Sequence, residues 1–233
     1  VYCLVNSKKS LDNIRRHYKY DVNVYLANTK DSSTVWQCQV KILAVKPQQL
    51  KNIVELENNK TNKDLLVSIL AGVSIDKLIK RFPNHKCIRV VTNIPITIGK
   101  GLTAISWEDG IPEYQKNLIK KLFESSSIIY EFPEDLLDIF LALTSSGPAI
   151  IALIIEALSD GGLSGGLQKQ LSEELVMEMI LGTVSLIKDT NLTTAELKNM
   201  VTSPGGTTIS ALRVLENKSL RSALIEAVVS ASN

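Results

Sequence analysis

The segment Val201–Thr208 combines glycines and hydroxyl side chains in an order that could bind a small anion. It reads Val-Thr-Ser-Pro-Gly-Gly-Thr-Thr and runs into an apolar helical pattern over Ile209–Leu215. Two adjacent glycines after a proline leave the backbone free to turn its N–H groups toward one point. Because the N-terminus of a helix carries partial positive charge, such a turn suits a carboxylate or a phosphate.

The same segment is also compatible with an ordinary capped turn between two helices. The hydroxyls of Ser203, Thr207 and Thr208 stand where N-cap side chains are common. Spacing alone therefore leaves two interpretations open, an anion pocket and a capped turn.

Other residues with catalytic potential lack suitable partners in the sequence. His17 lies in a polar helical stretch and His85 in a polar turn, and both are expected to be surface histidines because neither has an acidic or nucleophilic neighbour. The acidic pairs Glu134-Asp135 and Glu173-Glu174 are expected to be solvated helix starts. Metal-ligand spacing is absent from the sequence, so no metal site is predicted.

Composition narrows the class of protein. The chain has 233 residues, of which 45% are hydrophobic and 21% charged, with a formal net charge of +2. These values fit a globular protein of one or two domains and favour neither nucleic acid nor a membrane as a partner. The uninterrupted apolar runs are far shorter than a membrane span. With no signal peptide visible, and with Cys3, Cys38 and Cys87 odd in number, we expect a reducing, cytoplasmic environment.

The first half of the chain alternates short apolar strands with helices. This pattern predicts an α/β domain with a mostly parallel sheet and helices on both faces. The expected strands are Val1–Val5, Val22–Leu26, Val40–Val45, Leu65–Leu70, Ile88–Val91, Gly101–Ser106 and Ile128–Tyr130, and the helices are Leu11–Tyr18, Gln48–Leu56, Ser74–Arg81 and Glu113–Glu124. Ligands bind at the carboxyl ends of such strands, where Asn6, Lys46, Gly72 and Asn93 stand.

The turn after the first expected strand suits the ribose end of a dinucleotide. It reads Asn6-Ser7-Lys8-Lys9, and its basic residues would suit a 2′-phosphate, although a solvated loop can have the same composition. The G-x-G-x-x-G turn that binds a pyrophosphate is not in the sequence, and Gly99-Lys100-Gly101 is no substitute because it precedes a strand. Since the chain opens directly on a strand at Val1, we expect another strand and this turn upstream.

From about Pro133 the pattern is that of an all-helical bundle. Ser145–Pro148 supplies hydroxyl caps and a proline suited to the first turn of a helix. The helix body, Ala149–Ile155, is apolar on every side, and we expect the helix to end at Gly161-Gly162 and Gly165-Gly166. A helix that is apolar all round must be buried. Because the second half of the chain is small, we expect another subunit to bury this helix. The chain is therefore not expected to be a monomer.

Four segments together resemble the pyrroline-5-carboxylate reductase family, whose members catalyse the last step of proline synthesis. They are Ile42–Gln49, similar to the family's A-V-K-P segment, Asn93–Pro95 with Gly99–Thr103, similar to its M-P-N-T-P segment, Leu143–Ala149, similar to its S-G-S-G-P-A helix start, and Val201–Thr208, similar to its V-T-S-P-G-G-T-T signature. Their order and spacing extend from about Val1 to Ser232.

The resemblance implies an N-terminal Rossmann-like domain and an all-α C-terminal domain. We expect residues 1–132 to form the NAD(P)-binding domain, with its first strand and glycine-rich turn missing, and residues 133–233 to bind substrate and form a dimer. The implied reaction is hydride transfer from NAD(P)H to the C=N carbon of 1-pyrroline-5-carboxylate, which gives L-proline. A protonated imine is already electrophilic, so positioning and carboxylate binding should supply most of the catalysis.

The resemblance also assigns roles to individual residues. Backbone N–H groups of Gly205, Gly206 and Thr207 would hold the substrate carboxylate, and Ser203 would shape the loop. The Thr208 hydroxyl would reach the ring nitrogen and act in catalysis, with Glu134 at the substrate pocket. The implied cofactor-binding residues are Asn6, Ser7, Lys8, Asn28, Ala44, Val45, Lys46, Pro47, Ala71 and Asn93.

The cofactor implied is NADPH, with NADH possible, because amide, hydroxyl and ammonium groups follow the first strand. The implied partners are a small-molecule substrate and further copies of the chain, as a homodimer or a ring of dimers. Two other hypotheses stay open. One is a catalytically inactive or truncated paralogue that acts as a helical dimer, and the other is a related imine or β-hydroxyacid reductase. The intact Ser203–Thr208 loop argues against the second.

Overall fold

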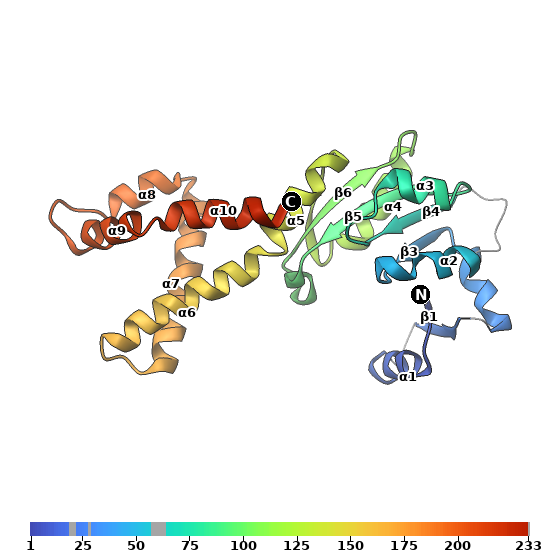
Figure 1. Cartoon of the computed structure of the whole chain (residues 1–233), viewed down its shortest axis with the longest axis horizontal. Coiled ribbons are helices and arrows are strands. Elements are labelled where there is room, and N and C mark those ends of the chain that lie inside the picture. The colour runs from blue at the N-terminus through green and yellow to red at the C-terminus, as the bar shows by residue number, and fades with distance from the viewer. Residues whose placement is uncertain (19–21, 28, 57–63, 233) are drawn as a thin grey trace. The chain divides into compact units, whose positions relative to one another are not determined.

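The computed structural model describes residues 1–18, 22–27, 29–56 and 64–232. It divides into two compact units, Val1–Leu137 and Asp138–Asn233. Figure 1 shows that the strands belong to the first unit and that the second consists of helices. The prediction of an α/β first half followed by an all-helical second half is confirmed.

The first unit contains two sheets in the described part of the chain. One pairs β1 (Tyr2–Val5) with β2 (Asn23–Leu26) in parallel. The other has five strands in the order β3-β4-β5-β6-β7. Their bounds are β3 (Val40–Leu43), β4 (Leu65–Ser68), β5 (Lys86–Thr92), β6 (Gly101–Trp107) and β7 (Ser127–Glu131). Only the β5–β6 pair of this sheet is antiparallel, so the sheet is mostly parallel as predicted.

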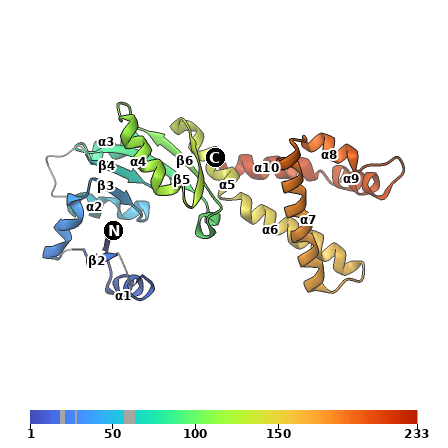
Figure 2. The same ribbon diagram turned by 180° about the vertical axis from the view of Figure 1, so that it is seen from behind.

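Helices cover both faces of the five-stranded sheet, as Figures 1 and 2 show from opposite sides. The connecting segments are α1 (Lys8–His17), η1 (Lys30–Gln37), η2 (Pro47–Gln49), α2 (Leu50–Leu56), α3 (Ile75–Arg81), η3 (Ile94–Ile98) and α4 (Glu113–Phe123). On one face Leu78 of α3 packs in a core with Leu66 of β4. On the other face Ile119 of α4 packs with Val67, because successive strand residues point to opposite faces.

His85 is buried, so the prediction of a surface histidine at this position is wrong. Its side chain is 4% exposed and its ring meets the edge of Phe82. Burial lowers the pKa of His85, and the Lys41 charge lowers it further, while Asp64 acts in the opposite direction. Lys41 Nζ donates to Asp64 Oδ2 at 2.7 Å and to the Cys38 carbonyl at 2.8 Å. The turn that contains His85 is polar in sequence, but it packs against the amino ends of the strands.

The second unit continues from η4 (Glu134–Leu136) of the first and contains most of α5 (Leu137–Thr144). Its other helices are α6 (Gly147–Ser164), α7 (Lys169–Thr190), α8 (Thr194–Met200), α9 (Thr207–Asn217) and α10 (Leu220–Ser232). The expectation that Gly161-Gly162 ends the long apolar helix is wrong, because α6 continues to Ser164. A Cβ on Gly162 would come within 2.2 Å of the Ser172 hydroxyl, so this glycine allows α6 and α7 to approach closely.

Much of the apolar surface of the second unit is exposed in a single chain. Leu153 of α6 and Leu181 of α7 are 65% and 60% exposed. The segment Glu134–Ser164 also has the length and composition of a membrane-crossing helix, with a mean hydropathy of 1.9. However, the helix is interrupted at Ser145-Ser146, and α6 itself has 18 residues. A large exposed apolar surface of this kind is typical of an interface with another molecule.

Candidate functional site

The carboxyl ends of β3, β4 and β5 lie at one edge of the sheet, because these strands are parallel. In the register of the sheet, Leu43 of β3 pairs with Ser68 of β4, which pairs with Arg89 of β5. The predicted cofactor residues that follow these strands therefore share this edge. They are Ala44, Val45, Lys46 and Pro47 after β3, Ala71 after β4, and Asn93 after β5.

Asn93 organises the loop at the end of β5. Its side chain is buried, and its Oδ1 accepts the backbone N–H of Leu102 at 2.8 Å. Its carbonyl accepts the N–H of Ile96 at 3.1 Å, which begins η3. These bonds set the orientation of the Asn93 amide at the sheet edge.

The segment after β3 is mostly exposed at the same edge. Ala44, Lys46 and Pro47 are exposed, and Val45 is half-buried against the core. The Lys46 carbonyl accepts the N–H of Gln49 at 2.9 Å, which starts η2 with Pro47 in its first turn. Ala71 is exposed as well. Small side chains and an exposed ammonium group at a strand end suit a phosphate-bearing ligand.

A basic surface hollow lies at α1. Ser7 caps this helix, because its Oγ accepts the N–H of Ser10 at 3.1 Å. Next to it is a hollow of about 680 Å³ that is lined by Lys8, Lys9, Ser10, Asp12, Asn13 and Arg16. Asn6, Ser7 and Lys8 are all exposed. The donor set of this hollow fits an anion such as a 2′-phosphate. Asn28, also a predicted cofactor residue, lies outside the described residues.

The glycine-rich loop of the second unit connects α8 to α9. Gly205 has a φ of +70°, a left-handed conformation that favours glycine. The Gly206 N–H donates to the Ser203 carbonyl at 3.1 Å, and Gly206 is the N-cap of α9. Among the described residues no side chain caps α9, so the interpretation as a hydroxyl-capped turn is wrong. The N-terminal N–H groups of α9 begin at Thr207, and Thr208 follows half-buried.

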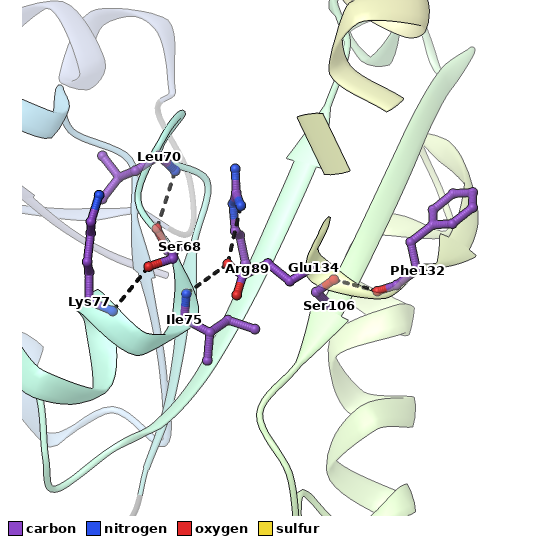
Figure 3. A network of polar contacts seen from close by, with 9 residues as sticks. Ser68, Leu70, Ile75, Lys77, Arg89, Ser106, Phe132 and Glu134 are labelled. Atoms are coloured by element: carbon purple, nitrogen blue, oxygen red, sulfur yellow. Dashed lines mark hydrogen bonds and ion pairs between the residues drawn. The ribbon is translucent and has the colours of Figure 1, made fainter. Parts of the chain in front are cut away.

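Glu134 is half-buried and engaged within the first unit, so the prediction of a solvated helix start is wrong. Its Oε1 accepts the Ile75 N–H at 2.8 Å and lies 3.2 Å from Arg89 Nη1 (Figure 3). We did not predict Arg89 as a functional residue. The available signal was its charge within the otherwise apolar strand Ile88–Val91.

These residues belong to two different units of the chain. The cofactor candidates and Glu134 belong to the first unit, and Ser203–Thr208 belongs to the second. Across the described ranges, no cluster of three or more histidine, cysteine or acidic side chains could hold a metal ion.

Sequence comparisons give relatives for both units. Residues 134–233 match the family model described as pyrroline-5-carboxylate reductase dimerisation. The pyrroline-5-carboxylate reductase of Synechocystis sp. is 44% identical over 190 residues, which are 82% of this chain and 71% of the relative. That of Glycine max is 38% identical over 203 residues, which are 87% of this chain and 74% of the relative.

Solved structures agree with these relatives. A Plasmodium falciparum pyrroline carboxylate reductase with NADP bound has a TM-score of 0.84 and 28% identity, over 99% of this chain and 84% of its own. A pyrroline-5-carboxylate reductase from Coxiella burnetii has a TM-score of 0.83 and 30% identity, over 100% of this chain and 86% of its own. The strand ends, the glycine-rich loop and these matches lead to one assignment: the chain belongs to the pyrroline-5-carboxylate reductase family.

Proposed function

We propose that this protein reduces 1-pyrroline-5-carboxylate to L-proline with NADPH, or with NADH, as hydride donor. The observation that carries the proposal is the uncapped N-terminus of α9 behind Gly205 and Gly206. It offers backbone N–H groups to a small carboxylate, while a parallel-strand edge suited to a dinucleotide exists in the same chain.

The residues at the sheet edge fit the cofactor. Asn6, Ser7 and Lys8 would hold the 2′-phosphate, since all three are exposed after β1 and Lys8 lines the basic hollow at α1. Asn28 would bind the adenosine side of the cofactor. The rest of the cofactor would contact residues at the ends of β3, β4 and β5, namely Ala44, Val45, Lys46, Pro47, Ala71 and Asn93. When bound, NADPH supplies the hydride.

The loop of the second unit would bind and orient the substrate. The N–H groups of Gly205 and Thr207 would hold its carboxylate, and the Thr208 hydroxyl would contact its ring nitrogen. The expectation that the Gly206 N–H also binds the carboxylate is not supported, because this N–H donates to the Ser203 carbonyl. Ser203 keeps the loop in shape, because its carbonyl accepts the Gly206 N–H at 3.1 Å. The protonated imine is already electrophilic, so orientation rather than strong acid catalysis is required. Glu134 is the acidic residue we assign to the substrate pocket.

We assign residues 1–132 to cofactor binding and residues 133–233 to substrate binding and dimerisation. The exposed leucines of α6 and α7 support an interface between copies of the chain, as a homodimer or a ring of dimers. The segment Glu134–Ser164 falls within the match to the dimerisation family, which favours a subunit interface over a membrane. We propose a cytoplasmic enzyme with neither nucleic acid nor membrane as a partner.

A direct assay tests this function. The purified protein is mixed with NADPH and 1-pyrroline-5-carboxylate, and NADPH oxidation and proline formation are followed together. We expect equal amounts of NADPH consumed and proline formed. A protein that assembles but oxidises no NADPH would instead support the inactive-paralogue hypothesis. Turnover with β-hydroxyacids or other imines, and none with pyrroline-5-carboxylate, would support the related reductase.

A further inference from the structure

Arg89 is a buried cation at the centre of the first unit. It lies on β5, the middle strand of the five-stranded sheet, and its side chain is only 4% exposed. A buried charge requires a partner, because burial removes its hydration. Glu134 supplies an anion, with Oε1 at 3.2 Å from Arg89 Nη1.

The Glu134 carboxylate joins three elements of the sheet domain. The oxygen that faces Arg89 of β5 also accepts the N–H of Ile75, the first residue of α3, at 2.8 Å. Ser74 caps the same helix by accepting the N–H of Lys77. Figure 3 shows the Glu134 carboxylate between β5 and the start of α3. Glu134 itself begins η4.

The segment that contains Glu134 is held by hydrogen bonds to the sheet at its start and by a buried side chain at its end. At its start, the Phe132 N–H donates to the Ile105 carbonyl at 3.1 Å, and the Ser106 hydroxyl donates to the Phe132 carbonyl. At its end, Leu137 is fully buried. The chain passes into the helical unit directly after Leu137. The Arg89–Glu134 pair therefore holds the last segment of the sheet domain before the helices begin.

We propose that Arg89 is a positioning residue for the reductase reaction. Its guanidinium contacts Glu134 and so fixes the orientation of the Glu134 carboxylate. This inference rests on the function proposed above, in which Glu134 belongs to the substrate pocket. A misplacement of about 1 Å in such a site can cost roughly 10²-fold in rate.

An arginine suits this task better than a lysine. Its planar guanidinium presents donors in a rigid fork, whereas an ammonium group is a point charge on a flexible stem. Arg89→Met keeps the volume and removes the charge. Glu134 then keeps its bond from Ile75 and its partial exposure, so the fold is expected to survive. Arg89→Lys restores a charge without the fork.

The test compares purified wild-type protein with Arg89→Met, Arg89→Lys, Glu134→Gln and the double variant Arg89→Met/Glu134→Gln. Lys120→Met is the control, because it breaks another ion pair of the sheet domain, Lys120–Glu131 at 2.5 Å. The measurements are kcat, KM for pyrroline-5-carboxylate, NADPH affinity by fluorescence, and hydrogen–deuterium exchange over residues 132–144.

We expect Arg89→Met to lower kcat by about ten-fold or more, because the Glu134 carboxylate is no longer held in one orientation. NADPH affinity should stay at the wild-type value, and Arg89→Lys should recover part of kcat. Exchange over residues 132–144 should become faster in Arg89→Met and stay unchanged in Lys120→Met. The double variant should be no slower than the slower single variant, because both remove one interaction.

Three results would overturn the proposal. They are an unchanged kcat in Arg89→Met, an unchanged exchange rate over residues 132–144, and fully multiplicative effects in the double variant. If Arg89→Met fails to fold, Arg89→Lys is used in its place. The proposal then requires that Arg89→Lys show both faster hydrogen–deuterium exchange over residues 132–144 and a lower kcat than the wild-type protein. A wild-type protein without reductase activity refutes the proposed function instead, and the exchange rates still show whether Arg89 anchors this segment.

Discussion

Gly206 lies so close to Ser203 that a Cβ on Gly206 would come within 2.5 Å of the Ser203 hydroxyl. The same glycine is the N-cap of α9 and donates its N–H to the Ser203 carbonyl at 3.1 Å. Ser203 and Gly206 therefore close a tight turn at the start of α9, where no side chain caps the helix. The shape of this turn depends on the absence of a side chain.

Gly206→Ala should disturb the turn, because the added methyl group would displace the Ser203 hydroxyl and lie only 3.2 Å from the Ser203 carbonyl oxygen. Overpacking of this kind costs about 1–3 kcal/mol locally. We expect a higher KM for pyrroline-5-carboxylate and an unchanged NADPH affinity. Thr202→Ala is a control in the same loop, since it adds no group and removes a methyl group and a hydroxyl that donates to the Lys198 carbonyl. Wild-type kinetics in Gly206→Ala would exclude this turn from substrate binding.

Thr208→Ala should lower kcat/KM for pyrroline-5-carboxylate and leave NADPH affinity nearly unchanged. A hydrogen bond to a charged group is worth about 1.5–3 kcal/mol, which corresponds to roughly 10- to 100-fold. Steady-state kinetics and NADPH fluorescence measure the two effects. Ser210→Ala, two residues further along α9, should behave as wild type. Unchanged turnover in Thr208→Ala would remove Thr208 from the mechanism.

Lys8→Ala should weaken the preference for NADPH over NADH. Lys8 lines the basic hollow at α1, and an exposed ion pair is worth up to about 1 kcal/mol. We therefore expect a rise of up to roughly five-fold in KM for NADPH. The KM for NADH should not change, because NADH has no 2′-phosphate. Equal changes for both cofactors would mean that Lys8 does not bind the 2′-phosphate, and Lys188→Ala serves as a control for net charge.

The thermal stability of the protein should fall as the pH drops below 6.5, the ordinary pKa of histidine. Burial among charged neighbours lowers the pKa of His85 in the folded state. The unfolded chain then binds the proton more readily, so acidification toward the lowered pKa favours unfolding. The His85 contribution is fully present above 6.5. Melting temperatures across this range measure it, and His85→Gln should flatten the slope.

His17→Gln is the matched control for this pH dependence. His17 is exposed on α1, with its Nδ1 at 2.9 Å from the Asn13 carbonyl. Its replacement should leave the slope of melting temperature against pH unchanged. An equal slope in wild-type protein and His85→Gln would show that other groups cause the acid sensitivity.

Leu153→Glu should disrupt assembly. Leu153 is 65% exposed in the single chain, and burying a leucine side chain contributes about 1.5–3 kcal/mol. A carboxylate at this position would have to be buried in the interface, which is unfavourable. Light scattering coupled to size-exclusion chromatography should show a smaller particle. Lys218→Glu should keep the wild-type mass, and an unchanged mass in Leu153→Glu would place the interface elsewhere.

The sequence predicts the elements of this fold better than their contacts. Apolar runs such as Leu65–Leu70 and Ile88–Val91 identify strands, because burial on both faces demands continuous apolar sequence. The helix η1 has no such pattern and was not predicted, although Trp36 anchors it in the core. The glycines inside α6 were mistaken for its end, since the approach of Ser172 cannot be read locally.

In the candidate site, too, local features can be predicted from the sequence and long-range contacts cannot. Its ligand-binding positions follow from strand ends and from the glycine-rich loop, which are local features. The partner of Glu134 does not, because Arg89 is 45 residues away in sequence and is brought near only by the fold. The burial of His85 has the same origin, since its neighbours Lys41 and Asp64 come from other strands and loops.

The sparse interior of the helical unit links its folding to the concentration of the protein. Among the described residues from α6 onward, only Ser159 and Ser172 are fully buried. Two serines cannot offset the conformational entropy lost in ordering five helices. We expect contacts between copies of the chain to supply much of the free energy that orders this half. Dilution should then destabilise it, so that its measured stability depends on the protein concentration.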